Sequence, residues 1–107
     1  MTASTLQQLA ERVKERAAAS PDVSYTRRLL DKGVAHCAKK LGEEAVETAL
    51  AAVNEDREAL IGEAADLLYH LLVVLAARGV ALAEVETALA GRMSRSGLEE
   101  KASRPRG

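Results

Sequence analysis

The sequence contains no phenylalanine or tryptophan, and only two tyrosines, Tyr25 and Tyr69, among its 107 residues. Proteins that bind single-stranded nucleic acid usually stack bases on several aromatic rings, so that class is not expected. The net charge of −1 also argues against a general electrostatic attraction to nucleic-acid phosphates. The composition is instead rich in alanine and leucine, which favours helices because these residues lose little conformational freedom in them.

Cysteine and long apolar stretches are equally scarce. The single cysteine, Cys37, cannot form an internal disulfide, and we expect it to be a small buried residue in a reducing compartment. The N-terminus has no apolar signal-peptide core. The longest apolar run, 67–77, is interrupted by His70 and is shorter than the roughly 20 residues that cross a bilayer. We therefore expect a cytoplasmic protein that neither binds nucleic acid nor enters a membrane.

The length of the chain is that of one small domain. A helical chain of this size buries about two-thirds of its unfolded surface and often completes its core by forming an oligomer. Apolar residues recur at helical spacing in five segments, and no strand pattern of any length occurs. We predict an all-α domain over 1–93, with helices at about 4–19, 24–32, 34–53, 56–78 and 82–93, and a polar, mobile tail over 94–107.

The ends and inner faces of these helices can be predicted too. We expect N-caps at Ser4, Asp56 and either Ser24 or Thr26, and glycines that end helices at Gly33 and Gly79. The inner side of the first helix should carry Leu6, Leu9 and Val13. On the third helix it should carry Val34, Cys37, Leu41, Ala45 and Ala49, and on the fifth Val85 and Leu89.

Closely spaced carboxylates recur on the two helices that flank the polar break at 54–56. Glu44 and Glu47 stand three residues apart on the first helix, and Glu63 and Asp66 repeat this spacing on the second. Helices joined by so short a break usually pack as an antiparallel hairpin, and Glu47 and Glu63 each lie about seven residues from it. The four carboxylates should therefore meet at one level and raise each other's pKa. A divalent cation would remove that repulsion.

The ligand types indicate which metal would bind. Carboxylate oxygens suit Mg²⁺, Mn²⁺ or Ca²⁺, but the Ca²⁺-binding loop pattern is absent, as are the Glu-x-x-His pairs of a di-iron bundle. We favour Mg²⁺, with Mn²⁺ possible, because Mg²⁺ typically binds a few carboxylates together with substrate phosphates. The structural alternative is a solvated glutamate face. His70 is interpreted as a hydrogen-bonded core histidine rather than a ligand.

The acidic pattern, Glu43-Glu44-x-x-Glu47 followed by Glu63-x-x-Asp66, resembles the metal motif of the all-α nucleotide pyrophosphohydrolase superfamily. Within it, SYTRRLLDKG (24–33), KKLGEEAVE (39–47), EAADLLYHLLVVLAARGV (63–80) and RSGLEEKASR (95–104) resemble phosphoribosyl-ATP pyrophosphohydrolases, which catalyse the second step of histidine biosynthesis. The nearly all-round apolar second half of the fourth helix predicts that two helical hairpins dimerise into a four-helix-bundle core, a fold class consistent with the resemblance. The resemblance implies Mg²⁺-dependent hydrolysis of phosphoribosyl-ATP to phosphoribosyl-AMP and pyrophosphate, by the form without a fused phosphoribosyl-AMP cyclohydrolase domain.

The resemblance also implies roles for individual residues. Glu44, Glu47, Glu63 and Asp66 would hold the metal, with Glu43 beside them or on a second ion. Glu47 and Glu44 are the catalytic candidates, since one glutamate would act as general base, and Glu47 is preferred for that role. The candidate substrate contacts are Tyr25, Lys32, Lys39, Lys40, Arg95, Lys101 and Arg104.

Two other functions fit the same sequence. A general (d)NTP pyrophosphohydrolase of the same superfamily would share the acidic motif but prefer ordinary or damaged nucleotides. A non-catalytic helical dimerisation module would place the same glutamates in solvent and would bind neither Mg²⁺ nor Mn²⁺.

Overall fold

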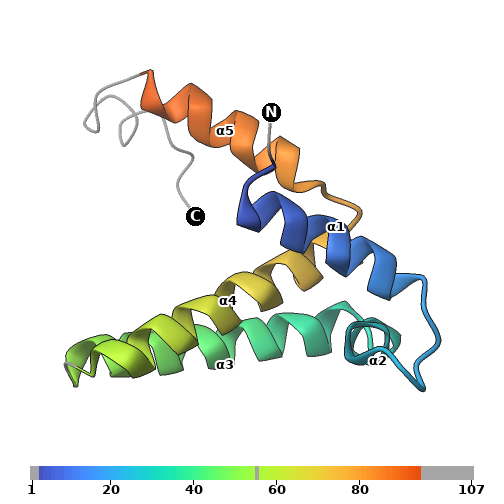
Figure 1. Cartoon of the computed structure of the whole chain (residues 1–107), viewed down its shortest axis with the longest axis horizontal. Helices are drawn as coiled ribbons and strands as arrows, with labels where there is room; N and C mark the ends of the chain where they lie inside the picture. The colour runs from blue at the N-terminus through green and yellow to red at the C-terminus, as the bar shows by residue number, and fades with distance from the viewer. Residues whose placement is uncertain (1–2, 55, 95–107) are drawn as a thin grey trace.

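The computed structural model describes residues 3–54 and 56–94, which form five α-helices (Figure 1). They are α1 (Thr5–Ala17), α2 (Tyr25–Asp31), α3 (Val34–Val53), α4 (Arg57–Ala77) and α5 (Leu82–Met93). The predicted all-α class and the order of the helices are confirmed, and no strand occurs in the described ranges. The first helix ends at Ala17, two residues earlier than predicted. The predicted tail beyond Ser94 lies outside the described residues.

The long helices α3 and α4 form an antiparallel hairpin that dominates the molecule (Figure 1). Asp56 caps α4 as predicted, because its side chain accepts a hydrogen bond of 3.1 Å from the Ala59 N–H group. Gly79 follows the last turn of α4 with a φ of 68°, the left-handed conformation that glycine adopts at low cost. Helix α4 therefore begins and ends where local signals in the sequence indicate.

The buried side of α3 differs from the predicted one. Cys37 and Ala51 are buried, and Glu44 is half-buried midway between them at intervals of seven residues. Three residues predicted on the inner side are exposed: Val34, Ala45 and Ala49. The prediction was wrong there because α4 packs against the side of α3 that carries Glu44, and not against the side richest in alanine.

A small core lies where the first four helices meet. It contains Val13 of α1, Leu29 of α2, Cys37 of α3, and Leu72 and Val73 of α4. The predicted inner face of α1 is confirmed, since two more of its leucines pack against this core. The core fixes α2 at the end of the hairpin opposite the turn (Figure 1).

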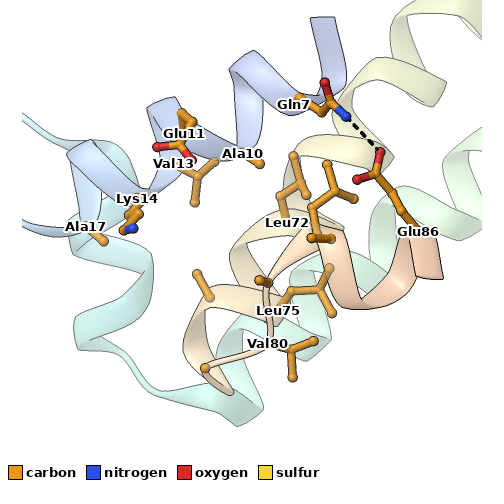
Figure 2. Close-up of a pocket in the computed structure, with 15 residues that line it drawn as sticks. Gln7, Ala10, Glu11, Val13, Lys14, Ala17, Leu72, Leu75, Val80 and Glu86 are labelled. Carbon is orange, nitrogen blue, oxygen red and sulfur yellow. Dashed lines mark hydrogen bonds between the residues drawn. The ribbon is translucent and has the colours of Figure 1, made fainter. Parts of the chain in front are cut away.

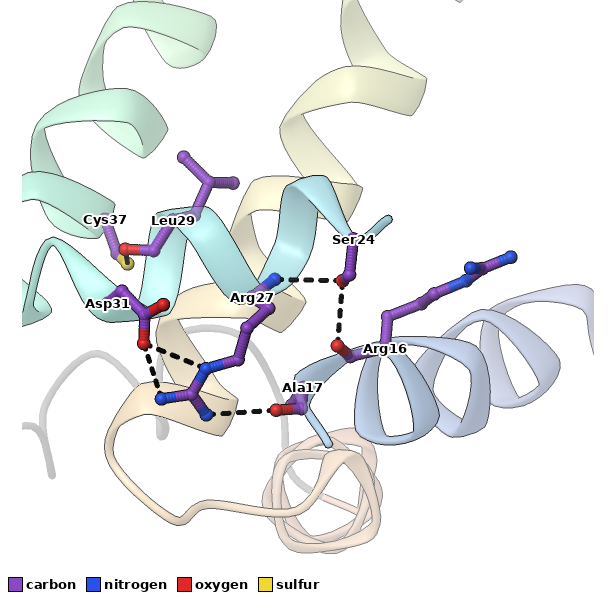
Figure 3. Close-up of polar contacts among 7 residues, drawn as sticks. All are labelled: Arg16, Ala17, Ser24, Arg27, Leu29, Asp31 and Cys37. Atoms are coloured by element: carbon purple, nitrogen blue, oxygen red, sulfur yellow. Dashed lines mark hydrogen bonds and ion pairs between the residues drawn. The ribbon is translucent and has the colours of Figure 1, made fainter. Parts of the chain in front are cut away.

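Hydrogen bonds hold the corner between α1 and α2 (Figure 3). The Ser24 hydroxyl accepts from the Arg27 N–H group at 3.0 Å, which confirms it as the cap of α2, and donates to the Arg16 carbonyl at 2.8 Å. The Arg27 guanidinium donates to the Ala17 carbonyl at 3.0 Å and to the Asp31 carboxylate at 2.8 Å. These contacts set the position of α2 relative to α1.

The monomer leaves much of its apolar surface exposed. Helix α5 has no buried residue, and Leu89, predicted on its inner side, is 52% exposed. Among the described helices, α4 alone is long and apolar enough to cross a membrane, and 17% of its most apolar 18-residue stretch is buried. One such helix is weak evidence for a membrane span. An apolar helix that packs against a second copy has the same properties.

Candidate functional site

Glu44, Glu63 and Asp66 form an acidic cluster between α3 and α4. One carboxylate oxygen from each residue lies within 4.8 Å of the other two. Glu44 and Glu63 are half-buried, whereas Asp66 is exposed. The antiparallel hairpin brings these residues to one level, as their similar distances from the turn predict. The cluster has the composition and size to hold a metal ion.

Glu47 also lies against this cluster. Hydrogen bonding to the Glu47 carboxyl, followed by burial and by contact with Glu44, raises the pKa of Glu63 from 4.5 to about 7. The negative charges of both neighbours act in the same direction. The prediction that converging carboxylates raise a pKa is therefore confirmed for Glu63. Such repulsion between carboxylates marks a place where a cation would bind favourably.

Two buried oxygens support the same interpretation. Oε2 of Glu44 and Oε2 of Glu63 have no hydrogen-bond partner within the described structure. A buried polar atom without a partner costs free energy, so such atoms usually indicate a missing ligand, water or ion. A donor set made only of carboxylate oxygens fits a hard divalent cation such as Mg²⁺ or Mn²⁺.

Glu43 lies outside the acidic cluster. Its exposed carboxylate accepts a hydrogen bond of 3.3 Å from Lys40 Nζ, and this contact is the main cause of a raised pKa at Lys40. Lys40 thus has a positive side chain within one helical turn of the cluster. The role of Glu43 beside the metal or on a second ion stays a prediction.

A cavity of about 550 Å³ opens between α2 and the first half of α3. Three of the predicted substrate contacts line it: Tyr25, Lys32 and Lys40. Lys39 does not line this cavity, and its side chain is exposed. The other three predicted contacts, Arg95, Lys101 and Arg104, lie outside the described residues.

Two further basic residues line the same cavity, Arg28 and His36. Neither was predicted as a substrate contact, although the sequence contains a signal for them. Together with Lys32 and Lys40 they recur every fourth residue, an interval that places side chains on one side of a helix. Gly33, with a φ of 97°, separates α2 from α3 and interrupts this period. We refer to the space that these four residues line as the basic cavity.

His70 and Tyr69 lie on α4 behind these sites. His70 is 7% exposed and packs edge-on against Tyr69, with ring centroids 5.0 Å apart. Its burial was predicted, but the expectation of a fully hydrogen-bonded histidine is wrong, because Nδ1 has no partner among the described residues. The hydroxyls of Tyr69 and Thr26 share a hydrogen bond of 2.6 Å, which ties α2 to α4 beside the basic cavity.

A second cavity, of about 520 Å³, lies between α1, the C-terminal end of α4 and the start of α5 (Figure 2). Leu72, Leu75 and Val80 give it an apolar wall, and a hydrogen bond of 3.3 Å from Gln7 to Glu86 crosses its rim. Of the predicted site residues that the structure describes, none lines this space. Its lining does not suit an anionic substrate.

The fold and the acidic cluster define an all-α protein whose helical hairpin carries a carboxylate site that could hold a metal ion. The phosphoribosyl-ATP pyrophosphohydrolase family model matches residues 6–93. The chain belongs to the phosphoribosyl-ATP pyrophosphohydrolase family, which confirms the resemblance found in the sequence.

Individual relatives match over nearly the whole chain. The identity to Phosphoribosyl-ATP pyrophosphatase 1 of Bradyrhizobium diazoefficiens is 66% over 100 residues, or 94% of each chain. The protein of the same name from Rhodopseudomonas palustris is 63% identical over 102 residues, or 95% of each chain. Phosphoribosyl-ATP pyrophosphatase of Methylobacterium nodulans is 58% identical over 106 residues, or 99% of each chain.

Proposed function

We propose that this protein hydrolyses phosphoribosyl-ATP to phosphoribosyl-AMP and pyrophosphate with Mg²⁺ as its cofactor. Family membership and the names of the relatives support the reaction, which is the second step of L-histidine biosynthesis. The single observation that best supports a bound metal ion is the pair of buried carboxylate oxygens, on Glu44 and Glu63, that have no hydrogen-bond partner.

Glu44, Glu47, Glu63 and Asp66 would hold the ion. The short separations within the acidic cluster and the raised pKa of Glu63 support this assignment. When bound, Mg²⁺ neutralises charge on the triphosphate so that water can approach phosphorus. The carboxylate of Asp66 is exposed and therefore accessible to a substrate, whereas Glu44 and Glu63 form the more buried part of the site.

Besides binding the metal ion, the protein has to supply a base and a group that stabilises negative charge on the substrate. The oxygen of a water molecule forms a bond to phosphorus, the anhydride bond to pyrophosphate breaks, and a base takes the proton. Glu47 is the best candidate for that base, because its carboxyl is exposed and is the largest influence on the pKa of Glu63 within the acidic site. Glu44 is the alternative. Lys40, one turn away on α3, would stabilise negative charge on the substrate.

The protein would act as a cytoplasmic homodimer in which two hairpins form a four-helix bundle. Exposed apolar side chains at helical spacing on the two long helices support this assembly, since such patches mark interfaces. They are Val46, Leu50 and Val53 on α3, with Ile61 and Leu68 on α4.

A substrate panel tests the proposal. Pyrophosphate release is measured from phosphoribosyl-ATP, ATP and the four dNTPs, each with Mg²⁺ and with EDTA. We expect release from phosphoribosyl-ATP, only with Mg²⁺, at a far higher kcat/KM than from the other nucleotides. Preferred turnover of dNTPs would replace the proposal with a general pyrophosphohydrolase, and no release from any nucleotide would leave a non-catalytic helical module.

A further inference from the structure

The basic cavity collects positive charge from two helices. Arg28 reaches it from α2, Lys32 from the C-terminal cap of that helix, and His36 and Lys40 from α3. Among the residues that the structure describes, Asp31 is the one acidic residue in its lining, and its carboxylate accepts a hydrogen bond from Arg27, which does not line the cavity (Figure 3). The local balance of charge therefore favours an anionic ligand.

Arg28 is held in place by groups that do not neutralise it. Its Nε donates to the Pro21 carbonyl at 2.6 Å, and Nη2 donates to the Asp22 carbonyl at 3.3 Å. Within the described structure neither Arg28 nor Lys32 has a carboxylate partner, whereas Lys40 is paired with Glu43. Arg28 is thus positioned with its charge uncompensated, an arrangement suited to recognising a phosphate.

The basic cavity and the acidic cluster are adjacent on α3. Lys40 lines the cavity and Glu44 belongs to the cluster, one helical turn further along. His36 lies a further turn away, so the two α3 residues that line the cavity stand about 6 and about 12 Å from Glu44 along the helix axis. A ligand with two separate anionic groups can therefore occupy both places at once.

Phosphoribosyl-ATP is such a ligand. It carries the triphosphate of ATP and, on a second ribose attached to its adenine, a separate 5′-phosphate. We propose that the basic cavity binds this 5′-phosphate, with Arg28, Lys32 and His36 as hydrogen-bond donors. The contact distinguishes phosphoribosyl-ATP from ATP, which lacks the added ribose phosphate. This assignment rests on the proposed function and adds the part of the substrate that each site recognises.

The test compares binding of phosphoribosyl-AMP and AMP to the full chain by calorimetry. The two ligands differ only in the phosphoribosyl group, and neither carries β- or γ-phosphates. We expect the wild type to bind phosphoribosyl-AMP at least about tenfold more tightly than AMP. Arg28→Ala and Lys32→Ala should each remove most of this preference and leave AMP affinity unchanged. Arg12→Ala, which removes an exposed arginine of α1, is the matched control and should keep the preference.

Each outcome decides the inference. The exposed Lys32 side chain makes no hydrogen bond or ion pair within the described structure, so Lys32→Ala stays informative even if Arg28→Ala weakens the fold. A preference that persists in both variants overturns the assignment. Pyrophosphate is titrated into the same variants. Loss of pyrophosphate affinity with an intact preference for phosphoribosyl-AMP would instead place the β- and γ-phosphates in the cavity, which also overturns the assignment. The proposed function fails separately, if the wild type releases no pyrophosphate from phosphoribosyl-ATP.

Discussion

Among single residues, Glu63 connects the fold to the chemistry most directly. Its carboxyl lies against Glu47 and Glu44, and these contacts with burial raise its pKa to about 7. An acid with a raised pKa in the folded chain binds its proton more tightly there than in the unfolded chain. The stability from this proton is complete below a pH of about 4.5 and is lost as the pH rises through about 7. A divalent cation would compensate for that loss.

The raised pKa of Glu63 predicts how the stability of the metal-free protein depends on pH. Without metal, the Tm of the wild type should fall between pH 5 and pH 8, and the Tm of Glu63→Gln should fall less, because glutamine cannot ionise. Mg²⁺ should raise the Tm of the wild type at pH 8 and have a much smaller effect on the variant. Thermal melts in EDTA and in Mg²⁺ measure both effects, and equal curves for the two proteins would contradict the prediction.

The hydrogen bond between Tyr69 and Thr26 predicts a second effect. Tyr69→Phe removes one partner of the 2.6 Å contact and should destabilise the protein by about 1 kcal/mol in urea denaturation. Tyr25→Phe is the matched control. Because Tyr25 is 55% exposed, this variant should have the stability of the wild type. Equal stability of both variants would show that the contact between α2 and α4 contributes nothing.

Among the helices, the N-terminal caps were predictable, whereas the buried side of α3 was not. Ser4, Ser24 and Asp56 cap helices through hydrogen bonds to groups three residues away, so the signal is local in the sequence. The inner side of α3 depends on where α4 packs, which a helical wheel of α3 alone does not contain. The wheel therefore placed Ala45 inside, whereas the structure exposes it.

Two glycines give a matched test of the helix ends. Gly79 has a φ of 68°, while Gly91 lies inside α5, and an added Cβ would meet nothing within 4 Å at either position. Gly79→Ala should therefore destabilise by about 1–2 kcal/mol through backbone strain alone. Gly91→Ala should stabilise by up to about 1 kcal/mol. Urea denaturation measures both, and the same sign for the two variants would contradict this assignment.

For the molecule as a whole, the acidic cluster was predictable and the basic cavity was not. The four carboxylates lie on the two arms of a hairpin whose turn is recognisable in the sequence. Their similar distances from that turn predict that they lie close together. The basic cavity depends on how α2 is placed against α3, and on a core that includes Leu29 and Cys37. Individual lysines such as Lys32 were therefore found, but the shared site with Arg28 was not.

We predict that two copies of the chain form a homodimer. Sedimentation of the wild type at micromolar concentration should give about twice the monomer mass of 11.4 kDa. Leu68→Asp, on the exposed apolar face of α4, should shift the mass to that of a monomer, because a charge cannot be buried there without a partner. Val23→Asp, in the loop between α1 and α2, should remain dimeric. A monomeric wild type would contradict the four-helix bundle.

The central claim is that the acidic cluster holds the cation needed to hydrolyse phosphoribosyl-ATP. Its most direct test is Mg²⁺-dependent pyrophosphate release by the wild type, Asp66→Asn and Glu58→Gln. Asp66 belongs to the cluster and Glu58, in the first turn of α4, does not, while both are exposed. We predict a loss of at least about a hundredfold in kcat/KM for Asp66→Asn and no change for Glu58→Gln. Release that continues in EDTA, or at the wild-type rate in Asp66→Asn, would contradict the claim.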